Sequence, residues 1–202
     1  MTGNVCDELE FGFGWIASEP ARLERASHAL ADNGRVWLID PVDIGELPAR
    51  IETLGEPAGV IQLLDRHERD CARLASRFAV PHLKPPFGRE HDLPFEILHV
   101  VDIPLWREAA LWWPERRTLV VADALGTAAY YLEPSEQLAV HPLLRLLPPR
   151  TLLRLEPDHV LCGHGPGVHG HDATKALAEA LQTARARIPG WLANVFRRKS
   201  SG

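Results

Sequence analysis

The hydrophobic pattern of the first third of the chain predicts a hairpin followed by a helix and a buried strand. The segments 27–30 and 35–40 are predicted to be two strands joined by a tight turn at Asn33-Gly34, because an Asn-Gly pair accepts the positive φ that such a turn requires. Proline and glycine then interrupt the pattern around a short helix, and the mostly apolar run 59–64 is typical of a buried strand. We therefore expect the chain to open with a hairpin.

Strand and helix patterns alternate through the rest of the chain. Four further runs rich in apolar residues are predicted to be strands: 95–103, 109–113, 117–122 and 158–162. A helix is predicted over 71–78, and prolines allow only a short interrupted helix within 140–153. A last surface helix is expected from the N-cap Asp172 to about Arg187, with Pro189-Gly190 as its stop.

This order of sheet, helix, sheet and helix predicts an α+β fold. Two layers of strands covered outside by helices make a four-layer αββα sandwich. The 202 residues, 46% of them hydrophobic, are enough for one sizeable core, so we expect a single domain over 1–202.

Composition narrows the partners and the compartment. The net charge is -5, and the short basic run 197–199 is better explained as a solvated terminus, so nucleic acid is not an expected partner. The three distant cysteines form no zinc knuckle or disulfide framework, and no signal peptide or membrane-spanning run is recognisable. We expect a soluble cytoplasmic protein with no membrane partner, and the sequence is compatible with a homodimer.

Ionisable residues gather where three predicted strands end. They are Asp65, His67, Arg69 and Asp70 after the first strand, Asp123 after the second, and His164 after the third. Active sites are built where such loops converge on a rigid scaffold. Three separate loops are therefore expected to meet at one site.

The order and spacing of these groups resemble the metallo-β-lactamase-fold hydrolases, including their glyoxalase II-like members. In that family one strand leads into His-x-His-x-Asp-His, a later strand ends in Gly-Asp, and the last ends in Gly-His-Gly. The corresponding segments here are 65–70, 122–125 and 162–166. Asp40-Pro41 after the predicted hairpin also matches the family's opening, so the resemblance covers nearly the whole chain.

Three family ligands are kept in type. The resemblance puts His67 at the second metal-binding histidine, Asp123 at the carboxylate that bridges two metals, and His164 at the last histidine ligand. A dinuclear zinc site uses several imidazoles and carboxylates to hold both ions and to lower the pKa of a bridging water. The retained residues alone are too few for that arrangement.

Four family positions have changed. Asp65 replaces the first histidine, Arg69 the motif's aspartate, Asp70 its final histidine, and Pro104 falls on the family's next histidine. Arginine carries its own positive charge and is not a metal ligand. We hypothesise that the guanidinium of Arg69 takes the place of a metal cation by forming a bidentate ion pair with the carboxylate of Asp70 or Asp123.

Two functions follow from the resemblance. The first is a metal-free or non-catalytic homologue that keeps the fold, has a degenerate dinuclear site, and binds a small molecule or a protein partner. The second is a hydrolase of an ester, thioester or similar bond, with one zinc, manganese or iron ion held by Asp65, His67, Asp123 and His164. In that case Asp65, Asp70 or Asp123 is the catalytic carboxylate.

Simpler explanations exist for the same residues. Asp65 and Glu68 form a capping-box-like pattern at the start of a helix, and a lone histidine is more often a hydrogen-bonded loop residue than a ligand. Cys162 is expected to be buried filler. Three tryptophans are expected to serve the core or a subunit contact: Trp106, Trp112 and Trp113.

Overall fold

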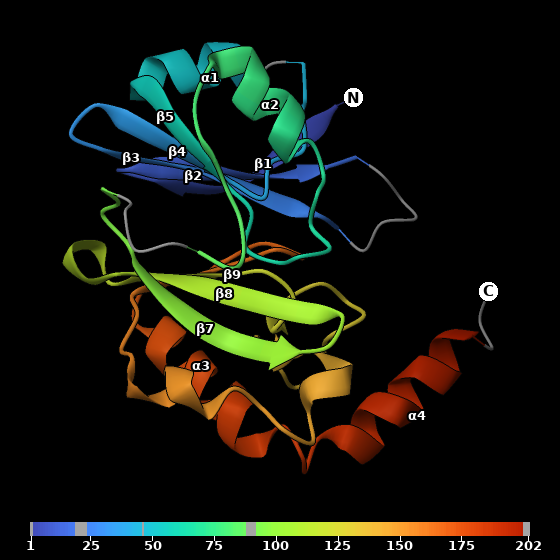
Figure 1. Ribbon diagram of the computed structural model, residues 1–202. Coiled ribbons are helices and arrows are strands. Elements are labelled where there is room, and N and C mark those ends of the chain that lie inside the picture. The colour runs from blue at the N-terminus through green and yellow to red at the C-terminus, as the bar shows by residue number, and fades with distance from the viewer. Residues whose placement is uncertain (1, 19–23, 46, 88–91, 200–202) are drawn as a thin grey trace.

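Two β-sheets lie between layers of helices in the computed structural model, which describes residues 2–18, 24–45, 47–87 and 92–199 (Figure 1). The first sheet has the strand order β1-β2-β3-β4-β5-β6, and the second has the order β13-β12-β9-β8-β7. Helices α1 and α2 cover the first sheet, and α3 covers the second (Figure 1). The predicted αββα sandwich is confirmed.

The bounds of the elements are as follows. The first sheet contains β1 (Gly3–Leu9), β2 (Gly12–Ala17), β3 (Ala26–Asp32), β4 (Arg35–Ile39), β5 (Glu56–Ile61) and β6 (His82–Leu83). The second contains β7 (Glu96–Ile103), β8 (Trp106–Trp113), β9 (Thr118–Val121), β12 (His159–Cys162) and β13 (Val168–His169). A small separate sheet pairs β10 (Leu125–Gly126) with β11 (Ala139–Val140). The helices are α1 (Leu47–Leu54), α2 (Cys71–Phe78), α3 (Asp172–Thr183) and α4 (Ile188–Lys199), with short 3-10 helices at Pro114–Arg116, Pro142–Leu144 and Arg150–Arg154.

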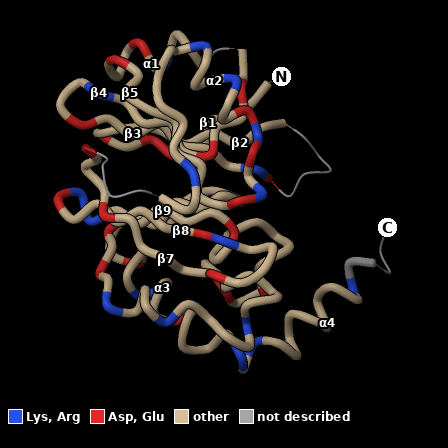
Figure 2. Tube along the Cα trace, in the orientation of Figure 1, with Lys and Arg blue, Asp and Glu red and all other residues tan. Residues whose placement is uncertain are grey.

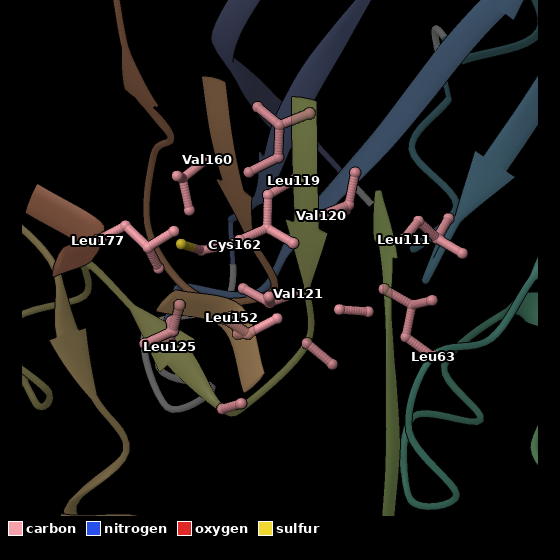
Figure 3. Packing of buried hydrophobic residues seen from close by; sticks show 14 of the residues in the cluster. Leu63, Leu111, Leu119, Val120, Val121, Leu125, Leu152, Val160, Cys162 and Leu177 are labelled. Atoms are coloured by element: carbon pink, nitrogen blue, oxygen red, sulfur yellow. The ribbon is translucent and has the colours of Figure 1, made fainter. Parts of the chain in front are cut away.

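Strand β4 shows how the layers are held together, because both of its faces are buried. Val36 and Leu38 pack under α1 and α2, while Trp37 and Ile39 point into the core between the two sheets. Successive side chains of a strand point to opposite faces, so one apolar run supplies two cores. The core of the second sheet continues to Leu177 of α3 (Figure 3).

The start and the end of the chain differ from the prediction. The hairpin of β3 and β4 exists, but β1 and β2 precede it; β1 is largely exposed, so it leaves no apolar run in the sequence. The last predicted helix stops at Thr183, and Pro189-Gly190 lies in the first turn of α4 instead of ending the helical part. A proline is tolerated there because the first-turn N–H has no helical partner anyway.

Two predicted helix starts are also corrected. Asp172 is the first residue of α3 and not its N-cap, which is His171. Helix α2 has Asp70 as its N-cap, so Asp65 and Glu68 form no capping box there.

Acidic and basic residues are interspersed over both halves of the molecule (Figure 2). Among the described residues, no helix is long and apolar enough to cross a membrane.

Candidate metal centre

The strand pairing brings distant loops to one edge of the sandwich. Strands β9 and β12 are parallel neighbours with Val121 opposite Cys162, so Asp123 and His164 follow equivalent ends of adjacent strands. Strands β4 and β5 are likewise parallel, with Ile39 opposite Ile61, which places Asp40 beside the segment leading to His67. Such strand ends are where open α/β sheets position functional groups.

His67, Asp123 and His164 form the only group of three or more potential ligands found among the described residues. One ligand atom from each lies within 4.8 Å of the others. The Nε2 atoms of His67 and His164 lie 2.9 Å and 3.1 Å from the same oxygen, Oδ1 of Asp123. Two imidazoles and a carboxylate suit zinc, manganese or iron.

The Oδ1 atom of Asp123 supports a metal at this point. It is buried, and no donor among the described residues reaches it with hydrogen-bond geometry, although both imidazoles are close. A buried polar atom left in this state is costly, whereas a cation among three converging ligand atoms would satisfy it. Burial alone would raise the pKa of Asp123, but His164 and His67 hold that pKa far below its ordinary value.

Asp40 orients His67. The Nδ1 atom of His67 is 2.9 Å from Oδ2 of Asp40, and the other oxygen of Asp40 accepts from the N–H of Leu63 at 2.9 Å. A metal-binding histidine almost always donates its second ring N–H to a carboxylate or a carbonyl, which leaves the other nitrogen free to bind. Burial and Arg69 oppose the charge of His67, yet Asp40 and Asp123 raise its pKa.

The loop that carries His164 is tightly held. The carbonyl of His164 accepts from the N–H groups of Thr127 at 3.0 Å and Ala128 at 3.2 Å. The ring of Tyr131 stacks on the imidazole with centroids 6.0 Å apart, and the hydroxyl of Tyr131 donates to the carbonyl of Asp123 at 3.2 Å. Gly165 follows with φ of +85°, a conformation that favours glycine.

Arg69 does not point to solvent, nor does it form the fork that the sequence suggested. Its guanidinium donates to the carbonyls of Asp40 and Gly163, each at 2.9 Å, and to the carbonyl of Ala26. These carbonyls belong to three different strand ends. Burial lowers the pKa of Arg69, and the carboxylates of Asp40 and Asp123 oppose that effect. A fixed positive charge therefore lies beside the candidate centre.

The remaining predicted site residues lie elsewhere. Asp65 accepts from the N–H of Arg107 at 3.1 Å and is not part of the group of three. Asp70 accepts from the N–H of Asp43 at 2.8 Å and pairs with Arg73 at 2.8 Å. The structure thus gives Asp70 a structural partnership and does not bring Asp65 or Asp70 into the candidate centre.

Several residues of the site were missed from the sequence. Arg66 lies 3.3 Å from Oδ2 of Asp123, and its guanidinium covers the ring of Trp106 at 4.5 Å. Trp106 was expected only in the core or at a subunit contact, so its contact with Arg66 is an additional one. His141 also packs on Trp106, and burial lowers its pKa to about 4. Only Asp40 had a sequence signal, because it stands at the end of a strand before a proline.

Solved structures with the same architecture include several metallo-β-lactamases. DIM-1 metallo-β-lactamase, in crystals exposed to ceftazidime, has a TM-score of 0.60 and 14% identity, covering 91% of this chain and 98% of that one. FIM-1 from Pseudomonas aeruginosa, in its mono-zinc form, has a TM-score of 0.57 and 11% identity, covering 92% and 97%. TTHA1623 in a di-iron-bound form has a TM-score of 0.57 and 21% identity, covering 79% and 95%.

These likenesses show that the chain has the metallo-β-lactamase fold, as the sequence motifs suggested. No protein-family model matches the sequence, and no curated protein sequence does so either. At these identities the likeness extends to the fold alone. Function has to be argued from the residues of the site.

Proposed function

We propose that this protein binds one divalent metal ion through His67, Asp123 and His164 and uses it to hydrolyse an ester, thioester or similar bond. The observation that carries the proposal is the convergence of both Nε2 atoms on Oδ1 of Asp123, a buried oxygen to which no group in the described part of the chain donates with hydrogen-bond geometry. The mono-zinc form of FIM-1 and the di-iron form of TTHA1623 are precedents for metals in this fold.

The residues around the group favour one ion rather than two. Arg69, which stands where the family has an aspartate ligand, donates to three carbonyls beside the site. Arg66 contacts the second oxygen of Asp123. Two positive charges beside one carboxylate disfavour a second cation there. The replacement of a metal ion by Arg69, inferred from the sequence, therefore remains part of the proposal.

A bound divalent ion would supply a water of lowered pKa as the nucleophile. The chain's own residues have simpler tasks. Asp40 holds the tautomer of His67, Tyr131 packs against His164, and the side chains of Arg66 and Trp106 border the centre. Asp65 and Asp70 were predicted as catalytic carboxylates; for Asp65 the role stays a prediction, whereas the partners of Asp70 argue for a structural one.

A metal-free homologue that binds a small molecule is the second candidate. It is favoured by the contact between Arg66 and Asp123, because this guanidinium can neutralise the carboxylate without any metal. In that case a His67→Ala variant changes folding stability but removes no ion.

Metal analysis of the purified protein separates the two functions. We expect about one zinc, manganese or iron ion per chain after incubation with each metal, and none in His67→Ala or Asp123→Asn. Hydrolysis of model esters and thioesters should disappear in the same variants. His171→Ala is the control, because that imidazole is fully exposed. Metal-free wild-type protein in every case would refute the proposal.

A further inference from the structure

Glu108 is a carboxylate buried where two of the functional loops meet. It is only 2% exposed and lies on β8, whose backbone bridges to Leu64, just before the 65–70 loop. Its Oε1 atom accepts from the N–H of Ala122 at 3.2 Å and from the N–H of Ala124 at 2.8 Å. These two residues flank Asp123, so one oxygen holds the backbone on both sides of a candidate ligand.

The second oxygen of Glu108 reaches Asp123 by another path. The indole Nε1 of Trp106 donates to Oε2 at 2.9 Å. The guanidinium of Arg66 lies over the Trp106 ring and contacts Oδ2 of Asp123 at 3.3 Å. One oxygen of Glu108 therefore holds the backbone on both sides of Asp123, and the other is linked to the Asp123 side chain through Trp106 and Arg66.

The chemistry of this position calls for a carboxylate. Two backbone N–H groups and one indole N–H are three donors, and a carboxylate accepts all three without bringing a donor of its own. A glutamine would place its NH2 group against the indole N–H of Trp106. Burial raises the pKa of Glu108 to about 7, so the protein tolerates an acid that is unfavourable to bury.

We propose that Glu108 is a positioning residue of the candidate metal centre, fixing the direction of the Asp123 carboxylate and thereby the affinity of the centre for a divalent ion. Glu108 itself does not belong to the group of potential ligands. Partners behind the ligands of a metal site typically change its affinity by about 10- to 100-fold. The inference rests on the proposed function, because only a protein that binds metal has an affinity to be set.

The test uses zinc competition with a chromophoric chelator, which gives a dissociation constant for each variant. Glu108→Gln keeps Oε1 but puts a donor opposite Trp106, and we expect its zinc affinity to fall by about 10- to 100-fold. Trp106→Phe removes the indole N–H but keeps an aromatic face for Arg66. The double variant has no donor–donor contact, so it should regain part of the affinity lost in Glu108→Gln.

Glu136→Gln is the matched control. Glu136 is also a buried carboxylate, but its partners are Arg145 at 2.8 Å and the backbone N–H of Glu133 at 2.8 Å, not the backbone on either side of Asp123. We expect this variant to melt at a lower temperature with zinc affinity unchanged. A Glu108→Gln protein that melts earlier but binds zinc like the wild type would show that Glu108 is only structural.

Two other outcomes are also decisive. If Glu108→Gln does not fold, Trp106→Phe alone carries the test, and wild-type affinity in that variant overturns the inference. If the wild-type chain binds no zinc, manganese or iron, the proposed function itself fails and the role of Glu108 fails with it. Metal binding by the wild type with equal affinity in both variants refutes the role of Glu108 alone.

Discussion

Asp40 and His67 are joined by a 2.9 Å contact between Oδ2 and Nδ1, although 27 residues separate them. The parallel pairing of β4 and β5 places the ends of these strands side by side, so a carboxylate after one strand meets an imidazole from the loop after the other. Asp40 has φ of +44°, and its two oxygens are both engaged, one with His67 and one with the N–H of Leu63. The contact presents Nε2 of His67 to Asp123.

Replacing Asp40 tests this orientation. Asparagine accepts a positive φ and can still accept from Leu63, so Asp40→Asn should fold. We expect its zinc affinity to fall by about 10- to 100-fold, because the ring nitrogen of His67 loses a charged partner. The same titration on Asp102→Asn, at an exposed carboxylate, should match the wild type. Equal affinity in all three proteins would contradict the role of Asp40.

Arg69→Leu should destabilise the fold strongly. The substitution leaves the carbonyls of Ala26, Asp40 and Gly163 without their guanidinium donor. The carbonyl of Asp40 still accepts from the Ser27 hydroxyl, and that of Gly163 from the N–H of Ala26, so these two acceptors keep a partner. Hydrogen bonds to a charged group contribute about 1.5–3 kcal/mol each, so we expect a loss of roughly 3 kcal/mol or more in the free energy of unfolding. The melting temperature should fall by about 6–12 °C.

Arg73→Leu is the matched control for Arg69. Its side chain is 59% exposed and pairs with Asp43 and Asp70 at the surface of α2. Exposed ion pairs contribute about 0–1 kcal/mol, so this variant should melt close to the wild type. Similar losses in the two variants would mean that the carbonyl contacts of Arg69 contribute little.

Two glycines with positive φ separate backbone strain from crowding at the His164 loop. A Cβ on Gly165 would clash with Thr127 and with the backbone of Ala128, whereas a Cβ on Gly170 would meet nothing within 4 Å. Gly170→Ala should lose about 1 kcal/mol of stability and keep its zinc affinity. Gly165→Ala should lose more stability and bind zinc more weakly, because the loop must move. Calorimetry measures the stability of both variants, and zinc titration measures their affinity. Equal stability and equal zinc affinity in the two variants would contradict the role of crowding at Gly165.

Asp7 should make stability depend on acid pH. Burial alone would raise its pKa, but hydrogen bonds with His169 and Gly167 help to lower it to about 2 from 3.8. A depressed pKa gives stability that is present above the unfolded value and is lost as pH falls from about 4 to about 2. The size is about 2 kcal/mol.

Urea unfolding of the wild type and Asp7→Asn measures this contribution. The difference between their free energies of unfolding should shrink by about 2 kcal/mol between about pH 5 and about pH 2. A difference that stays constant over that range would show that the protonation of Asp7 is not linked to folding. Asp92→Asn, at a carboxylate that is 93% exposed, should show no such change.

Much of the fold was predictable because its signals are local. The Asn33-Gly34 turn, the apolar run before Asp65 and the helix Cys71–Phe78 each depend on spacing within a few residues. Strand β1 was missed since an exposed edge strand has no apolar alternation to reveal it. Strand β2 is an interior, buried strand, but Gly12 and Gly14 interrupt its short apolar run. Helix α4 was missed because Pro189 reads as a stop when its place in a first helical turn is unknown.

For the site, the sequence by itself determined which residue types end the strands, and so it indicated His67, Asp123 and His164 as a group. Only the tertiary structure decided their neighbours. Contacts such as Asp40 with His67, or Glu108 with the backbone beside Asp123, join residues that are 14 or more positions apart. Such pairs depend on strand register and on the packing of one sheet against the other, and a register shift of one residue would turn each side chain to the opposite face.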